Sequence, residues 1–349
     1  MKRKQSACLL ASMLLPGVLL GWPSRAGAQS TNLTTIEQML PAYEQYADDC
    51  EAALNALPTP YSPAVQDDVN EAMLRINALR SIPTIIQKDP SYFNNSIKPS
   101  NLVAWKQGWD YFLACAQAGA DSFAGMTSGT RAYVSPIDGG LLFYELQLPA
   151  DYTPSKTYPL LVLLHPGGAY FWEANGVGGA PSNNPKYANS TETITIHPFG
   201  RGSNSYAGMG EASVLEALAD AEARYPIDLN RILVGGASMG AVGGFRFGCF
   251  YPDLFAACYS ITGDTDYMLP KYNGMFDPIE SLCNYANIGV CIWDAPKDLS
   301  YTQNEQVASD LSALQQTYPG YYPYVKYTDP NGKHGVIDPT LLQEGWDWM

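Results

Sequence analysis

Residues 231–240 read Arg-Ile-Leu-Val-Gly-Gly-Ala-Ser-Met-Gly, in which an apolar run leads directly into a glycine-flanked serine. The run is typical of a short buried strand, and the mostly apolar residues 239–250 are typical of a helix. Gly236 and Gly240 flank Ser238 in the pattern G-x-S-x-G, which occurs nowhere else in the chain. A serine on such a strand-to-helix turn projects its hydroxyl above a sheet, beside a helix N-terminus that favours developing negative charge. The stretch therefore predicts a nucleophile; the alternative interpretation is a glycine-rich turn whose serine only caps the helix.

Strand-like and helical segments alternate along the chain from about residue 130. We expect strands at 141–148, 158–164, 193–196, 231–235, 256–261, 288–293 and 322–327. We expect helices at 211–225, 239–250 and 303–318, and a closing helix from residue 339. This alternation predicts an α/β fold with a doubly wound, mostly parallel sheet, whose functional residues lie at the carboxyl ends of the strands.

Three helical segments precede the alternating region. Residues 34–37 resemble a capping box, and Ser62-Pro63 offers an N-cap followed by proline at the first helical position. A third helix is expected at 102–118, and the proline-containing runs 58–60 and 82–83 are interpreted as loops. We therefore predict a helical appendage over 29–125 and an α/β domain over 126–349.

The composition excludes several classes of protein. The chain has 349 residues and a formal net charge of −14, with 15% charged and 46% hydrophobic residues. A chain this apolar is expected to form a packed core rather than to be disordered. The excess of acidic residues argues against nucleic acid as a partner, because phosphates would be repelled. No segment beyond the first 28 residues approaches the ~20 apolar residues that span a membrane, so we expect no membrane span.

The first 28 residues have the features of a signal peptide. Lys2-Arg3-Lys4 is a basic start, residues 7–20 are mostly apolar, and Ala26-Gly27-Ala28 fits a cleavage site. We therefore expect a signal peptide at 1–28 and a secreted or periplasmic protein. Its removal would take away four basic residues and no acidic residue, which changes the formal net charge from −14 to −18.

Six cysteines follow the predicted cleavage site, and an even number in an exported chain favours disulfides. Cys50 and Cys115 both lie in the helical region, and Cys283 and Cys291 lie close together near the C-terminal strands. Cys249 and Cys258 are then paired by elimination. The predicted pairs are Cys50–Cys115, Cys283–Cys291 and Cys249–Cys258, and six buried thiols are the alternative. The chain has no C-x-x-C pair and only three histidines, so no metal site is expected.

A serine nucleophile requires a base, and hydrolases with a serine on this turn place the acid and then the histidine after it. Only His334 follows Ser238, in the turn-rich run 331–335. We predict that His334 is the base. His165 and His197 end earlier strands and are the alternatives.

The acid is expected just beyond the strand at 288–293. Asp298 lies in the loop after this strand, where a carboxylate can orient an imidazole and stabilise its cation. Asp294 lies nearer the strand and is the second candidate, with a role in capping the turn as its other interpretation. Asp264 and Asp266 follow the preceding strand and are more distant candidates.

Two backbone amides are expected to stabilise an oxyanion. One belongs to Met239, the residue after the nucleophile. The other is assigned to Gly167, with Gly168 next, because Pro166 has no N–H. An aromatic run follows and is expected either to bind substrate or to pack in the core: Tyr170, Phe171 and Trp172.

These residues together resemble the α/β-hydrolase superfamily from about residue 144 to the end of the chain. Besides the serine motif, the resemblance is carried by residues 158–168, 208–211, 228–232 and 251–257. The chain is most similar to secreted esterases of the polyhydroxybutyrate-depolymerase and feruloyl-esterase type and to prolyl-oligopeptidase-like catalytic domains. The resemblance implies an α/β-hydrolase catalytic domain over 126–349 and a triad of Ser238, Asp298 and His334.

The function expected from this sequence is that of a secreted serine hydrolase acting on a small-molecule or polymer-linked carboxylic ester, without a metal or an organic cofactor. A serine peptidase of the prolyl-oligopeptidase-like type is the alternative, and a non-catalytic binding module is a third. The ester is favoured because the sequence shows neither a propeller domain nor an obvious acidic pair for a peptide N-terminus.

Overall fold

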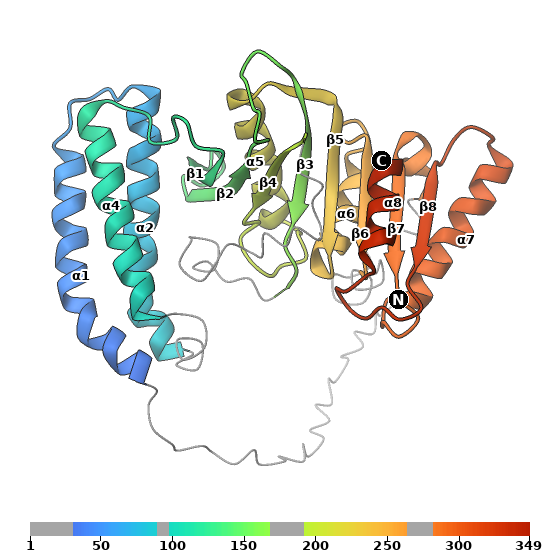
Figure 1. Cartoon of the computed structure of the whole chain (residues 1–349), viewed down its shortest axis with the longest axis horizontal. Helices are drawn as coiled ribbons and strands as arrows, with labels where there is room; N and C mark the ends of the chain where they lie inside the picture. The colour runs from blue at the N-terminus through green and yellow to red at the C-terminus, as the bar shows by residue number, and fades with distance from the viewer. Residues whose placement is uncertain (1–30, 89–97, 168–191, 264–281) are drawn as a thin grey trace, which may run out of the picture.

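A single sheet is the centre of the structure, a computed structural model that describes residues 31–88, 98–167, 192–263 and 282–349. Within these residues the sheet has eight strands in the order β1-β2-β4-β3-β5-β6-β7-β8 (Figure 1). β2 is antiparallel to β1 and β4, and the other neighbouring strands are parallel. The bounds are Ser128–Val134 (β1), Leu141–Gln147 (β2), Tyr158–Leu164 (β3), Ile194–Pro198 (β4), Ile227–Ala237 (β5), Ala257–Ile261 (β6), Gly289–Asp294 (β7) and Tyr324–Thr328 (β8). The predicted α/β class with a mostly parallel sheet is confirmed.

Helices cover both faces of this sheet. Alternate residues of β3 show why: Leu160 and Val162 belong to one hydrophobic cluster with residues of the helices α5, α6 and α7, whereas Leu161 and Leu163 belong to another with residues of α8. Strands buried on both faces explain the continuous apolar runs in the sequence. The bounds of these helices are Met209–Arg224 (α5), Met239–Phe250 (α6), Tyr301–Thr317 (α7) and Pro339–Trp348 (α8), and a short 3₁₀ helix lies at Leu282–Asn287 (η2).

The three N-terminal helices stand side by side at the β1 end of the sheet (Figure 1). They are α1 (Thr31–Asn55), α2 (Pro63–Lys88) and α4 (Pro99–Ala118). They share a hydrophobic core of their own, in which Ile36, Ile76 and Trp109 are fully buried. The predicted helical region therefore packs around its own core and contacts the sheet mainly through α2.

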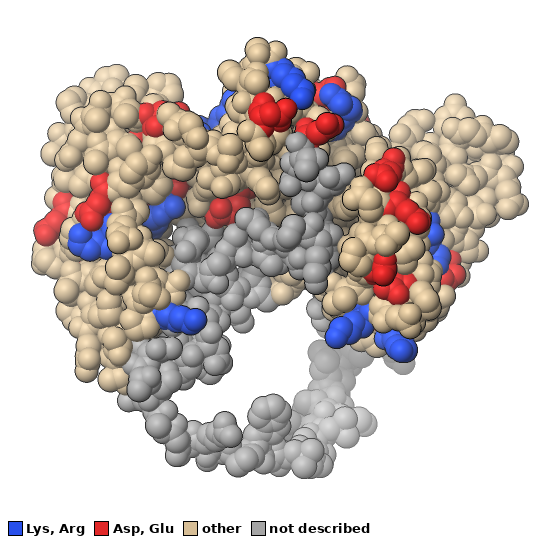
Figure 2. Space-filling model, viewed as in Figure 1, with Lys and Arg blue, Asp and Glu red and all other residues tan. Residues whose placement is uncertain are grey.

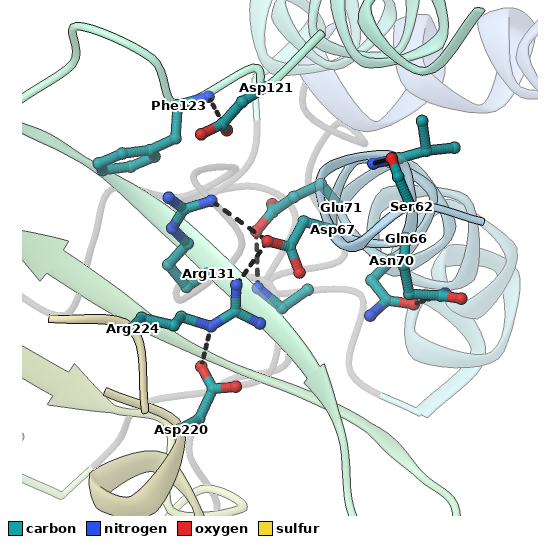
Figure 3. A network of polar contacts seen from close by, with 12 residues as sticks. Ser62, Gln66, Asp67, Asn70, Glu71, Asp121, Phe123, Arg131, Asp220 and Arg224 are labelled. Atoms are coloured by element: carbon teal, nitrogen blue, oxygen red, sulfur yellow. Dashed lines mark hydrogen bonds and ion pairs between the residues drawn. The ribbon is translucent and has the colours of Figure 1, made fainter. Parts of the chain in front are cut away.

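Polar contacts join α2 to the sheet and to α5. Glu71 on α2 accepts a hydrogen bond of 2.6 Å from the backbone amide of Ala132 on β1. Figure 3 shows Arg131 from β1 and Arg224 from α5 directed at Asp67 of α2, and Arg224 forms an ion pair with it. Because Glu71 and Asp67 lie one turn apart, one face of α2 makes these contacts.

The run 82–83 does not form the predicted loop, since α2 continues through it to Lys88. Pro83 removes one hydrogen bond from the helix, which ordinarily disfavours proline at an interior position. The neighbouring Leu79, Ile82 and Ile85 are buried in the helical core. Burial of three large apolar side chains offsets the loss of that bond.

The predicted disulfides are absent, because none of the six cysteines after residue 30 forms one. Cys249 and Cys258, a predicted pair, belong to the same hydrophobic cluster and are both free thiols. Cys283, the predicted partner of Cys291, is exposed on η2. An even number of cysteines does not show whether any two side chains meet with the geometry of a disulfide, and this is why the count misled.

Charged side chains are sparse on the face of the molecule shown in Figure 2, where acidic and basic residues lie scattered over a mostly uncharged surface. This agrees with the 15% of charged residues in the sequence. None of the described helices combines the length and the apolar composition that a membrane span requires.

Candidate active site

Ser238 lies on a sharp turn between β5 and α6. Its backbone has a φ of 55°, an unfavourable left-handed conformation for a residue with a side chain. Gly236 and Gly240 allow this turn, because a Cβ at either position would lie 2.1 Å from the carbonyl oxygen of Leu164. The turn therefore brings Ser238 to the N-terminus of α6, at the carboxyl end of the parallel strands.

His334 lies within hydrogen-bond distance of this serine. Its Nε2 is 2.8 Å from the Oγ of Ser238, although the two residues are 96 positions apart in the chain. The loop between β8 and α8 carries His334, whose side chain is 60% exposed. The imidazole thus reaches the serine from the solvent side and stays accessible to water.

Asp298 contacts the other ring nitrogen of this histidine. Its Oδ2 lies 2.7 Å from Nδ1 of His334, and only 1% of its side chain is exposed. Its Oδ1 accepts hydrogen bonds from the backbone amide of Ser300 at 2.9 Å and from the hydroxyl of Ser300 at 2.6 Å. Burial alone would raise the pKa of Asp298, but the hydrogen bonds from Ser300 and His334 outweigh it and lower the pKa below its usual range.

Asp294, the second candidate for the acid, makes different contacts. It lies at the end of β7 and is fully buried, with its Oδ2 3.1 Å from Nζ of Lys326 on β8. Burial raises the pKa of Asp294. Of the two carboxylates, Asp298 is the one that contacts His334. The more distant candidates Asp264 and Asp266 lie outside the described residues.

The other two histidines are buried near the ends of β3 and β4. The His165 ring lies 2.8 Å from the carbonyl oxygen of Pro166 and 2.9 Å from that of Phe199. His197 lies within β4, and burial lowers its pKa to about 4, so this ring is neutral at ordinary pH. Of the three histidines, all of them described, His334 is the one that the structure places within hydrogen-bond distance of Ser238.

Gly167 and Met239 lie close together beside Ser238. A Cβ added at Gly167 would be 3.9 Å from the Cβ of Met239, and Gly167 is exposed to solvent. Met239 is the first residue of α6. The two predicted oxyanion donors are therefore neighbours, whereas Gly168 and the aromatic run Tyr170, Phe171 and Trp172 lie outside the described residues.

Two residues that our sequence analysis did not identify organise this site. Ser300 holds one carboxylate oxygen of Asp298. Asp329 accepts hydrogen bonds from the amides of Asn331 and Asp338, near the start and the end of the loop that carries His334. A signal for Asp329 does exist, since Asp-Pro-Asn-Gly at 329–332 is a favourable β-turn sequence and forms that turn.

The solved structures to which we compare this chain are distant from it in sequence. No family model and no curated protein matches the chain. A solved thermostable esterase is 22% identical with a TM-score of 0.47, and the match covers 64% of this chain but only 62% of the esterase chain, less than two thirds. A ferulic acid esterase from Anaeromyces mucronatus is 17% identical with a TM-score of 0.47, over 62% of this chain and 87% of that chain. Dipeptidyl peptidase 4 from Porphyromonas gingivalis is 15% identical with a TM-score of 0.46, over 63% of this chain and 35% of that chain.

The fold itself is defined by this chain's own geometry. A mostly parallel eight-stranded sheet carries its serine on the turn from β5 to α6, and the aspartate and the histidine follow β7 and β8. This combination, rather than the distant similarities, gives the chain the α/β-hydrolase fold.

Proposed function

We propose that this chain is a serine hydrolase that cleaves carboxylic esters through an acyl-enzyme. The observation that carries the proposal is the continuous hydrogen-bond chain from Ser238 through His334 to Asp298. A serine hydroxyl is a poor nucleophile unless a neighbouring base takes its proton, and this arrangement supplies the base together with the group that orients it.

Each residue of the proposed triad has a defined role. The carboxylate of Asp298 accepts the Nδ1–H of His334, which leaves Nε2 as the acceptor for the hydroxyl proton of Ser238. The Ser238 Oγ attacks the ester carbonyl while His334 takes the proton. His334 then donates this proton to the departing alkoxide, and an alcohol leaves the acyl-enzyme.

Water completes the cycle. His334 takes a proton from a water molecule, whose oxygen attacks the acyl carbon, and the carboxylic acid departs as Ser238 recovers its proton. The 60% exposure of the His334 side chain supports this step, because the imidazole faces solvent. We assign the oxyanion site to the backbone amides of Met239 and Gly167, whose proximity and position at the α6 N-terminus support the assignment.

We further propose that the protein is exported after removal of residues 1–28, as their signal-like composition suggests. A neutral ester, small or linked to a polymer, suits a protein whose formal net charge is −14, or −18 without residues 1–28, better than a polyanionic substrate does.

The decisive experiment measures hydrolysis of p-nitrophenyl acetate, longer acyl esters, feruloyl esters and peptide anilides. We expect ester turnover by the wild-type protein, none above background for Ser238→Ala, and near wild-type turnover for Ser309→Ala, a serine exposed on α7. Hydrolysis of anilides without esters would favour the peptidase alternative. A folded wild-type protein no more active on any substrate than Ser238→Ala would disprove the proposal.

A further inference from the structure

We infer that Thr262 is a positioning residue for the proposed site, because its hydroxyl anchors the turn that carries His334. The inference rests on the proposed function, since it concerns how the proposed base is placed. Thr262 directly follows β6. In the sheet, β6 lies between β5, which leads to Ser238, and β7, which leads to Asp298.

The anchored turn is short and well defined. The backbones of Lys333 and Val336 pair with each other through two hydrogen bonds, of 3.1 and 2.8 Å. His334 and Gly335 form the tip between them. The amide N–H of Gly335 donates a hydrogen bond of 2.7 Å to Oγ1 of Thr262. Because this amide belongs to the peptide bond that follows His334, the Thr262 hydroxyl fixes the backbone of His334 itself.

Thr262 and the residue before it contact all three segments that bear the proposed triad. The carbonyl of Ile261 accepts the amide N–H of Ser238 at 3.0 Å. The amide of Thr262 donates to the carbonyl of Trp293, near the end of β7, at 2.9 Å. The hydroxyl of Thr262 accepts from Gly335. Two consecutive residues thus place the nucleophile, the strand before the acid and the turn of the base relative to one another.

The conformation of Thr262 is itself unfavourable. Its φ is 47°, in the left-handed region that β-branched residues rarely adopt, and its side chain is fully buried. Glycine or asparagine would adopt this backbone more readily. The hydrogen bond that the Thr262 hydroxyl accepts from Gly335 explains why a threonine occupies this position in spite of its unfavourable backbone.

The test compares kcat and KM for p-nitrophenyl acetate in Thr262→Val, which keeps the shape and loses the hydroxyl, and Thr262→Ser, which keeps the hydroxyl. We expect Thr262→Val to lower kcat by about 10- to 100-fold at an unchanged KM, since small displacements of a reacting group have effects of this size. Thr262→Ser is expected to stay close to wild type. Thr195→Val is the matched control, since Thr195 is equally buried on β4 and its hydroxyl has no hydrogen-bond partner among the described residues.

Amide hydrogen exchange of Gly335 gives a readout that does not depend on catalysis. We expect faster exchange in Thr262→Val and wild-type exchange in Thr262→Ser, even if the proposed ester hydrolysis fails. Should Thr262→Val not fold, Thr262→Gly is the second variant, because glycine adopts the positive φ of this position without strain. We expect Thr262→Gly to fold and to have a kcat as low as that expected for Thr262→Val. The inference would be overturned if Thr262→Val or Thr262→Gly kept both the wild-type kcat and the wild-type exchange rate of the Gly335 amide. It would also be overturned if Thr262→Ser lost as much kcat as Thr262→Val.

Discussion

The carboxylate of Glu71 on α2 accepts a hydrogen bond from the backbone amide of Ala132 on β1. This amide lies on the side of β1 away from β2, at the edge of the sheet, where an unpaired N–H would otherwise be available to another strand. The other oxygen of Glu71 lies 2.8 Å from Nη1 of Arg75, so both oxygens of this buried carboxylate are satisfied. The helical appendage is therefore joined to the sheet by a specific hydrogen bond.

Replacement of Glu71 by alanine is expected to destabilise the protein by about 2–3 kcal/mol, because it leaves the buried amide of Ala132 without its acceptor. Glu71→Gln keeps an acceptor oxygen for this amide, so we expect it to lower the free energy of unfolding by less than Glu71→Ala does. Urea unfolding measures both, with Glu37→Ala on the exposed surface of α1 as the control. Equal stabilities for Glu71→Ala and the control would show that this contact contributes nothing.

His197 makes a prediction about pH and stability. Burial lowers the pKa of His197 to about 4, so the unfolded chain binds a proton below pH 6.5 that the folded chain does not. The free energy of unfolding is therefore expected to fall by up to about 3 kcal/mol as the pH is lowered from about 6.5 to 4, because of this histidine.

His197→Gln is expected to remove that part of the pH dependence, as measured by urea unfolding at several pH values. The variant should still turn over esters, since the structure places no contact between His197 and Ser238. An inactive but folded His197→Gln together with an active His334→Ala would exchange the roles that we assign to the two histidines.

Asp298 and Asp294 are distinguished by the same kind of substitution. Asp298→Asn is expected to lower kcat by about 10³- to 10⁴-fold, because an amide no longer stabilises the required tautomer and charge of the imidazole. Asp294→Asn weakens the contact with Lys326 and is expected to change stability while leaving kcat within a few-fold. Steady-state kinetics and thermal unfolding of both variants test this, and the opposite pattern would make Asp294 the acid.

The six thiols give a direct test of the missing disulfides. Cys283 is exposed, whereas burial raises the pKa of Cys50, Cys258 and Cys291. We expect a thiol reagent such as Ellman's to modify Cys283 fastest in the native protein, and Cys283→Ser to lack this fast phase. Unfolding without reductant should expose all six thiols in a chain that lacks residues 1–28. A smaller number would mean that disulfides form after all.

Much of the fold was predictable where buried strands and helices determine the sequence locally. The strand at 158–164 and the helix at 239–250 have the predicted bounds, because both are continuous apolar segments. The strand β1 escaped prediction because Ser-Gly-Thr-Arg-Ala-Tyr-Val has few apolar residues. An edge strand is specified largely by its neighbours, here β2 and the distant Glu71, and not by its own composition.

The site was predictable to a similar extent. Chain order and strand ends were sufficient to identify Ser238, Asp298 and His334, which the structure brings together. Thr262 was not predictable, because it acts through the backbone amide of Gly335, which the folded loops bring to it. The turn sequence at 329–332 indicates the local contacts of Asp329 but not the hydrogen bond that it accepts from the amide of Asp338. Patterns of residue types carry no information on such partners.

The covering of β1 by α2 also determines how copies of this chain could share a sheet. At that end the helical appendage occupies the edge, whereas β8, at the other end, has no further strand beside it among the described residues. Of the two edge strands in the described part of the chain, β8 is therefore the one whose outer side is not covered by the helical appendage. Pairing of two copies through β8 would be self-complementary and would leave β1 of each copy under its own helices, so sheet pairing alone would join two copies about a twofold axis.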